Sequence, residues 1–311
     1  MSYALPFELA AILLGLLLGS FLNVAIYRLP RGESLASPRS HCPACGETIR
    51  WYDNIPLLSW ILLRGRCRHC HAPISWRYPA VELATAVWFL LAYLATHRAI
   101  LADFAAAGPD HTARLLLDGV GVSIAGFLLI GLAVIDWQTQ TLPDALTLTG
   151  TAIGFFLTCV QAVFLRTGEG DIHLHPRSNM RLQSPGSFAA RGDVFLTGTE
   201  ALVLGRVAAI LAAAGLLLLI RATYKALRGR EGMGLGDAKL LGMIAAFLGF
   251  GDAMLAFFLG MIACAGYAVV LLARGRATAA TKLPLGSFLA AGGLVTALLG
   301  EAVLTWYKGL L

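Results

Sequence analysis

Long apolar segments alternate with short polar ones along this chain, and this pattern constrains the fold more than any other feature. A transmembrane helix needs about 20 mostly apolar residues, and we identify candidates at 5–27, 79–97, 115–135, 143–165, 200–220, 238–251, 253–273 and 283–306. Only 14% of the residues are charged, against roughly a quarter in soluble proteins, so polar groups are too few to cover a water-facing surface. The sequence therefore predicts an all-α, polytopic integral membrane protein with about eight transmembrane helices.

Two of these segments need comment. Segment 5–27 lacks a basic start and a small-residue cleavage site, so we expect it to remain as a membrane anchor. Segment 238–251 is short, and reaches only about 21 Å at 1.5 Å per residue, against a hydrocarbon core of about 30 Å. Either the bilayer is thinner there, or the glycine-rich stretch before it dips below the membrane surface and lines a cavity.

Lysine and arginine are distributed unequally between alternate loops. Sixteen lie in 28–78, 221–239 and 274–282, and six lie in the loops between them. The positive-inside rule places the richer loops, and the turn after Asp136, in the cytoplasm, with both chain ends outside. Segment 166–199 then lies outside, and its polar, unpatterned sequence predicts a flexible loop.

Segment 28–78 is the only sizeable polar stretch, and it contains two Cys-x-x-Cys pairs. Cys42 and Cys45 form the first pair, and Cys67 and Cys70 the second. This spacing is typical of a zinc site with four thiolate ligands. About 50 residues cannot build much of a core, and a bound metal supplies the missing folding energy. Two disulfides are the alternative, which a reducing cytoplasm disfavours.

The same segment is basic, which raises the possibility of a nucleic-acid partner. Its stretch from Trp51 to Leu63, however, is largely apolar. Such a stretch is poor for binding phosphates and suited to docking on a bilayer or on the helices beneath it. We therefore expect the lipid bilayer as a partner, and no nucleic acid.

Two aspartates at the ends of apolar segments are the candidate catalytic residues, because ionisable residues there are costly and functional by default. Asp136 ends the third segment, and Asp237 begins the sixth after Gly234 and Gly236. Two carboxylates brought together can share a proton, so that one activates water and the other protonates the substrate, as in aspartic proteases. The glycines would let a substrate strand lie against the backbone.

Simpler roles for these aspartates remain open. Asp237 is well placed to cap a helix start, and Asp144, after Pro143, fits a cap of the fourth segment with a supporting polar role possible. Asp136 is harder to explain as a cap, because an anion at a helix C-terminus opposes the helix dipole. A helix C-terminus disfavours an anion and a helix N-terminus favours one. On this ground alone, a proton shared by the two carboxylates is predicted to reside on Asp136, and Asp237 is predicted to be the base.

Two other functions also fit aspartates within membrane helices. In a transporter they would form an ion or proton relay within broken helices, although no inverted repeat is evident. In a non-enzymatic scaffold, the cysteine module would dock a secretion partner. Asp-to-Asn changes separate the three: a protease loses cleavage, a transporter loses flux and a scaffold is unaffected.

Several motifs taken together resemble the bifunctional prepilin peptidases, a family of membrane aspartic proteases. Besides the cysteine pairs and the block around Asp136, they are 19–24 (GSFLNV), 28–30 (RLP), 53–60 (DNIPLLSW), 74–82 (ISWRYPAVE), 234–237 (GLGD) and 283–286 (LPLG). The resemblance implies Asp136 and Asp237 as the catalytic pair and the four cysteines as zinc ligands. Segment 166–199 departs from it, being longer and more polar than the family pattern.

The resemblance also implies an activity at the cytoplasmic face of the bacterial inner membrane. The enzyme would remove the basic leader from type IV prepilins or type II secretion pseudopilins, and then methylate the new N-terminal residue, usually Phe, with S-adenosylmethionine. Methylation rests on resemblance alone, because no GxGxxG motif follows a strand. We divide the chain into a first transmembrane helix (1–27), a four-cysteine zinc module (28–78) and a protease core (79–311).

Overall fold

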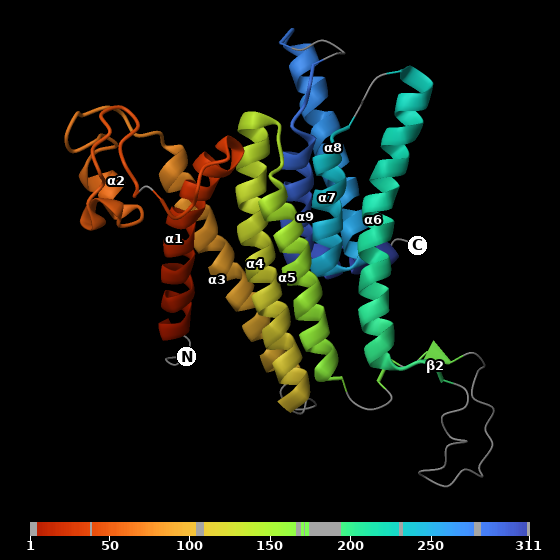
Figure 1. The fold of residues 1–311 in the computed structure, drawn as a ribbon. Coiled ribbons are helices and arrows are strands. Elements are labelled where there is room, and N and C mark those ends of the chain that lie inside the picture. The colour runs from red at the N-terminus through yellow and green to blue at the C-terminus, as the bar shows by residue number, and fades with distance from the viewer. Residues whose placement is uncertain are drawn as a thin grey trace, which may run out of the picture.

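The computed structural model describes residues 5–37, 39–103, 109–165, 169–170, 172–173, 194–229, 233–276 and 281–309, and nearly all of their regular structure is helical (Figure 1). The long helices are α1 (Leu5–Arg28), α3 (Arg77–Asp103), α4 (Pro109–Thr139), α5 (Asp144–Val163), α6 (Gly198–Arg228), α7 (Leu235–Leu248), α8 (Phe250–Ala273) and α9 (Leu285–Lys308). Between α1 and α3 lie only the short helices η1 (Leu29–Arg31), η2 (Trp51–Asn54) and α2 (Leu58–Leu62).

Six of the described helices, α1, α3, α4, α5, α6 and α8, are long and apolar enough to cross a membrane. Helix α9 has 24 residues and contributes an apolar stretch at Leu285–Gly300, and α7 has 14 residues. Together they account for the eight predicted segments, and the short sixth one is confirmed. The protein is therefore a multi-pass membrane protein of the predicted all-α class.

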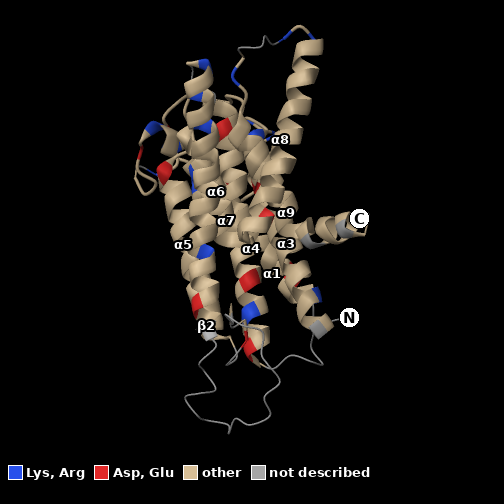
Figure 2. Ribbon diagram, turned by 90° about the vertical axis from the view of Figure 1, so that its right-hand side faces the viewer, with Lys and Arg blue, Asp and Glu red and all other residues tan. Residues whose placement is uncertain are grey.

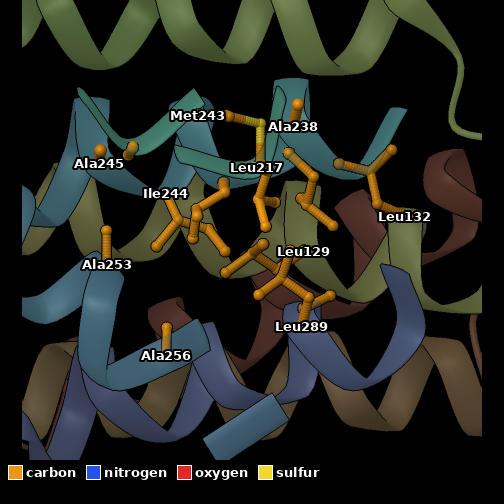
Figure 3. Close-up of a cluster of buried hydrophobic side chains, with 14 of the residues drawn as sticks. Leu129, Leu132, Leu217, Ala238, Met243, Ile244, Ala245, Ala253, Ala256 and Leu289 are labelled. Atoms are coloured by element: carbon orange, nitrogen blue, oxygen red, sulfur yellow. The ribbon is translucent and has the colours of Figure 1, made fainter. Parts of the chain in front are cut away.

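Helix α7 can be short because protein surrounds it. It packs against α4, α5, α6, α8 and α9, and Leu240, Leu241 and Met243 are fully buried. Figure 3 shows this core, in which Met243 and Ile244 of α7 lie close to side chains such as Leu129, Leu217 and Leu289 from neighbouring helices. Backbone groups at the ends of a short helix are tolerated at membrane depth only when protein or a cavity surrounds them. The helices packed around α7 meet this requirement.

Glycines allow the closest helix contacts, as is common in membrane bundles. A side chain at Gly15 of α1 would lie 2.6 Å from the Cα of Ala86 on α3. Similarly, a side chain at Gly260 of α8 would lie 2.9 Å from the Cα of Leu289 on α9. These contacts join α1 to α3, and α8 to α9, with little space between the backbones.

The segment between α1 and α3 lies beside the bundle, at the end where α4 finishes and α5 and α7 begin (Figure 1). We call this the module end. The C-terminal ends of α6 and α8 lie at the same end (Figure 1), and Figure 2 shows Lys and Arg there in blue. The predicted cytoplasmic loops therefore share one end of the bundle.

The opposite end contains the described part of segment 166–199. Here β1 (Ile172–His173) pairs antiparallel with β2 (Val194–Leu196), so the prediction of an entirely unpatterned loop is wrong at these residues. Glu169 also forms a 2.7 Å ion pair with Arg114 of α4. Residues 174–193 of the predicted loop lie outside the described residues.

Candidate active site and metal centre

The two predicted catalytic aspartates come together at the module end. Asp136 lies in the last turn of α4 and is 5% exposed, and Asp237 lies in the first turn of α7 and is 8% exposed. The two carboxylates are close enough to interact electrostatically. Two buried carboxylates from separate helices thus form one acidic centre.

Ser287, near the start of α9, holds Asp136. Its backbone N–H and its hydroxyl both donate to Oδ2 of Asp136, at 2.7 and 3.0 Å. The hydroxyl is also 2.9 Å from the carbonyl oxygen of Ala133, so its single hydrogen is shared between two acceptors. Amide groups at a helix N-terminus favour an anion, so α9 offsets the unfavourable position of Asp136 at the end of its own helix.

Asp237 caps its own helix as well as facing Asp136. The backbone N–H of Gly234 donates to its Oδ2 at 3.1 Å, so the predicted helix-capping role is present. The other oxygen, Oδ1, accepts no hydrogen bond from the part of the chain that the structure describes. One oxygen of Asp237 therefore fixes the side chain and the other is free for chemistry.

Leu142 packs between the two glycines of the centre. A side chain at Gly236 would lie 2.9 Å from the Cβ of Leu142. One at Gly286 would lie 3.0 Å from the Cδ1 of Leu142 and 3.0 Å from the Cγ of Asp136. The group that lies close against Gly236 is thus the side chain of Leu142. The sequence had suggested a substrate strand at this place.

Asp144 forms an ion pair with a residue of α7. Its Oδ1 is 2.6 Å from Nζ of Lys239, and the side chains are 60% and 37% exposed respectively. No side chain caps the start of α5 at Pro143. Asp144 therefore links α5 to α7, because Lys239 lies two residues after Asp237. The place of Asp144 in the first turn of α5 did not predict this contact.

The four cysteines of the module converge. The sulfur atoms of Cys42, Cys45, Cys67 and Cys70 all lie within 4.8 Å of one another, and those of Cys42 and Cys70 are 3.8 Å apart. A tetrahedral zinc ion with Zn–S bonds of about 2.3 Å separates its sulfurs by about 3.8 Å. The cluster could therefore hold a metal ion, and its size and its four thiols fit zinc.

The two cysteine loops repeat the same backbone pattern. Cys42 N–H bonds to the carbonyl of Glu47, and Cys67 N–H bonds to that of Ala72. The residue after each pair, Gly46 in the first loop and His71 in the second, has a positive φ, of 74° and 58°. The segment thus contains two copies of one loop, each contributing two of the clustered cysteines.

The thiols of these loops titrate unequally. Backbone hydrogen bonds from Cys70 and His69 lower the pKa of the Cys67 thiol to about 6. A backbone hydrogen bond from Glu47 lowers the pKa of the Cys45 thiol, but desolvation and hydrogen bonds with the three neighbouring cysteines raise it to about 12. A bound metal ion would hold all four sulfur atoms as thiolates, because the thiolate is the form that ligates a metal.

The module is joined to the bundle by polar contacts. The Oε2 atom of Glu82, on α3, accepts a 2.8 Å hydrogen bond from the backbone N–H of Leu57, whose φ is 59°. Where the module's two ends enter the bundle, Asn23 of α1 donates to the carbonyl of Tyr78, in the first turn of α3, at 3.0 Å. These residues belong to motifs singled out in the sequence, and the structure gives them a role in positioning.

Sequence reasoning missed three residues of the centre: Ser287, Leu142 and Lys239. Ser287 directly follows the 283–286 motif, which was the only available signal for it. The pairings of Ser287 with Asp136 and of Lys239 with Asp144 join positions far apart in the chain. Such contacts depend on how the helices are arranged, which no local pattern encodes.

Comparisons with known proteins agree with this architecture. Residues 13–96 match the bacterial peptidase A24 N-terminal domain, and residues 187–269 match the type IV leader peptidase family. The four cysteines lie in the first matched region and Asp237 in the second, whereas Asp136 lies between them. No solved structure matches the chain significantly.

Several curated proteins are similar over most of the chain, and each is named a prepilin leader peptidase/N-methyltransferase. The one from Burkholderia pseudomallei is 35% identical over 93% of this chain and 84% of its own length. Those from Stutzerimonas stutzeri and Pseudomonas aeruginosa are 32% identical over 98% of this chain and 95% of their own.

Proposed function

This chain belongs to the prepilin leader peptidase/N-methyltransferase family, and on that premise we propose that it cleaves the basic leader from type IV prepilins or type II secretion pseudopilins and N-methylates the new N-terminal residue. The observation that carries the peptidase activity is the meeting of Asp136 and Asp237 in one buried acidic centre. Membrane-embedded carboxylates are retained where they do chemistry.

In this proposal Asp136 activates the water. Two donors from Ser287 stabilise its anion, whereas the cap from Gly234 gives Asp237 one. Asp136 would take a proton from water as the water oxygen attacks the scissile carbonyl, and a protonated Asp237 would protonate the carbonyl oxygen. Collapse of the tetrahedral intermediate would then release the amine, which takes the proton held by Asp136, while Asp237 takes its proton back from one hydroxyl of the diol and the carboxylic acid product remains. This order reverses the one that the helix ends alone predict, because α9 supplies the donors.

The module end, with the acidic centre, would face the cytoplasm of a bacterial inner membrane. The distribution of Lys and Arg supports this orientation (Figure 2). The positive-inside rule would also hold a basic leader on the cytoplasmic side. The leader would then reach the acidic centre without crossing the membrane. The core from residue 79 to 311 would then carry hydrolysis, with α1 packed against it.

The module of residues 28–78 would hold one zinc ion between its four cysteines. The metal would be structural, because four thiolates fill a tetrahedral shell and leave no open position for a substrate. Methylation follows from the family, with S-adenosylmethionine as the activated methyl donor. The described strands, β1 and β2, form only a two-stranded antiparallel pair, so a nucleotide-binding parallel sheet is not part of the described structure.

Cleavage of a prepilin peptide by the purified protein in detergent tests the proposal. Mass spectrometry should detect the shortened peptide with the wild-type chain, and none with Asp136→Asn or Asp237→Asn. Asp118→Asn is the matched control, because Asp118 lies on α4 about 27 Å from Asp136 along the helix and bonds to Gln161. Cleavage by either dyad variant at the rate of the control would refute the catalytic pair.

A further inference from the structure

A cavity of about 320 Å³ lies between α1 and the module that carries the four cysteines. The second half of α1 forms one wall, and parts of the module between residues 35 and 56 form the other. Figure 1 shows the module beside the end of α1. Ser20, Arg28 and Asn54, which line this α1 cavity, come from three of the motifs singled out in the sequence. None of them takes part in the chemistry described above.

The walls of the α1 cavity carry positive charge. Arg28 is only 5% exposed, and its Nη1 atom donates to the carbonyl oxygens of Ser34 and Leu35 at 2.9 and 3.2 Å. These two acceptors are uncharged, so they fix the guanidinium without cancelling its charge. Arg39 also lines the cavity and is exposed. Among the described residues that line it there is no Asp or Glu. The cavity therefore favours an anionic ligand, and phosphate suits arginine best.

Glu82 of α3 is an acid that adjoins the same wall. It is 8% exposed and accepts hydrogen bonds from the hydroxyl of Ser20 and from the backbone N–H of Leu57. Glu82 thus joins α1, α3 and the module to one another. It is not one of the residues that line the cavity, so the lining remains basic.

The α1 cavity opens on the side of α1 that faces lipid. Leu17 and Phe21 line it, and they are 62% and 47% exposed. Leu13 and Leu14, about one turn earlier, are 59% and 49% exposed. Exposed apolar side chains on a membrane-spanning helix lie against acyl chains. Arg28 follows Phe21 by about two turns, or about 10 Å along the helix. Apolar and basic groups therefore follow one another as the chains and the phosphate do in a phospholipid.

S-adenosylmethionine is the main alternative occupant, because methylation needs a site for the donor. This molecule carries a sulfonium and an ammonium group against one carboxylate, so its net charge is positive. Two arginines repel such a ligand, whereas they attract a phosphate. An opening toward lipid also offers no advantage to a water-soluble donor. The charge of the lining and the direction of the opening both favour a phospholipid.

We propose that Arg28 and Arg39 bind the headgroup phosphate of an anionic phospholipid, whose acyl chains lie along Leu17 and Phe21 of α1. Basic pockets beside transmembrane helices bind such headgroups on the cytoplasmic side, which is the side proposed above for the module end. The amide of Asn54 adds a neutral donor to the site. The bound lipid bridges α1 and the module, and so holds the module at the membrane surface. This site is independent of both activities proposed above.

Native mass spectrometry of the delipidated, full-length protein in detergent tests the site with phosphatidylglycerol and phosphatidylcholine as probes. The wild-type protein should bind phosphatidylglycerol more tightly, because its headgroup is negatively charged and that of phosphatidylcholine is neutral overall. Arg39→Gln should weaken phosphatidylglycerol binding roughly fivefold, as expected for one arginine at a membrane surface, and should leave phosphatidylcholine binding unchanged. Arg39→Lys keeps the charge and should retain most of the affinity.

Arg31→Gln is the matched control. Arg31 is an exposed arginine of the same module, its guanidinium carbon lies 4.0 Å from the ring centroid of Tyr27, and it does not line the cavity. This variant should bind phosphatidylglycerol as the wild type does. Equal binding of the two lipids by the wild type would overturn the site, and so would an equal loss of affinity in Arg31→Gln and Arg39→Gln.

Two soluble competitors separate a phospholipid from other ligands of the cavity. Glycerol phosphate carries the phosphate without the acyl chains, and at equal concentration it should not displace phosphatidylglycerol. Displacement by glycerol phosphate would assign the cavity to a free phosphate compound. Displacement by S-adenosylmethionine would assign it to the methyl donor. Either result would overturn the lipid site, and retention of the lipid in both experiments would support it.

Discussion

Ser287 places two donors, its backbone N–H and its hydroxyl, on a single oxygen of Asp136 from a position 151 residues away in the chain. The contact ties the last turn of α4 to the first turn of α9. It also turns a carboxylate that opposes the dipole of its own helix into one favoured by the start of another. The geometry of the acidic centre therefore depends on how α4 and α9 pack.

Ser287→Ala removes the hydroxyl and leaves the backbone donor in place. A hydrogen bond to a charged group is worth about 1.5–3 kcal/mol, so we expect cleavage to fall roughly ten- to hundredfold while the protein remains folded. Peptide cleavage and thermal unfolding in detergent measure the two effects. Ser123→Ala is the control, because that hydroxyl donates within its own helix, to the carbonyl of Gly119. Wild-type cleavage by Ser287→Ala would show that the hydroxyl has no catalytic importance.

Gly286→Ala should displace the carboxylate of Asp136. The added methyl group would lie 3.0 Å from both Cγ and Oδ2 of Asp136, closer than ordinary van der Waals contact. Misplacing a catalytic group by about 1 Å can cost about a hundredfold in rate, so we expect cleavage to fall at least tenfold. Gly205→Ala on α6 meets open space and should cleave normally. Equal rates for the two variants would contradict the close packing at Gly286.

The proton shared by the dyad should reside mainly on Asp237. The cause is the unequal number of donors, two on Asp136 and one on Asp237. The infrared carbonyl band of a protonated carboxyl group should therefore disappear in Asp237→Asn and persist in Asp136→Asn. Because the two sites are coupled, the band reports location more directly than a pH–rate profile. If the band persisted in Asp237→Asn, the proton would have to be assigned to Asp136.

Zinc removal should unfold the module without disrupting the bundle. Metal analysis of the purified chain should find one zinc per molecule, and a Cys42→Ser, Cys67→Ser double variant should contain none, since binding there is also folding energy. Segment 42–70 should then become sensitive to protease. Cys159→Ser, which changes a cysteine of α5 outside the cluster, should keep its zinc. A full complement of metal in the double variant would exclude the site.

The sequence predicts the parts of this protein that depend on local composition. Apolar length gives the helices, and the Cys-x-x-Cys spacing gives a cluster whose sulfur atoms do converge. It also indicates Asp136 and Asp237, because a charge at the edge of an apolar segment is visible without a structure. It does not reveal what each carboxylate touches. Ser287 and Leu142 reach the centre through helix packing, and the donors from α9 are the reason we propose a proton assignment opposite to the one drawn from the helix ends.

The repeated cysteine loops allow a prediction that concerns backbone strain alone. Gly46 and His71 occupy equivalent positions with φ of 74° and 58°, a region where glycine is unstrained and other residues lose about 1 kcal/mol. His71→Gly should therefore relax the second loop, partly offset by the greater freedom of glycine in the unfolded chain. We expect zinc to be held a few-fold more tightly against a competing chelator.

His69→Gly is the matched control for this change. His69 is also an exposed histidine of the second loop, but its φ is not positive, so glycine there should bring no gain. The comparison also tests the ligand set, because four thiolates leave no place for an imidazole. If His71→Gly released the metal while His69→Gly retained it, His71 would be a ligand and the four-cysteine site would need revision.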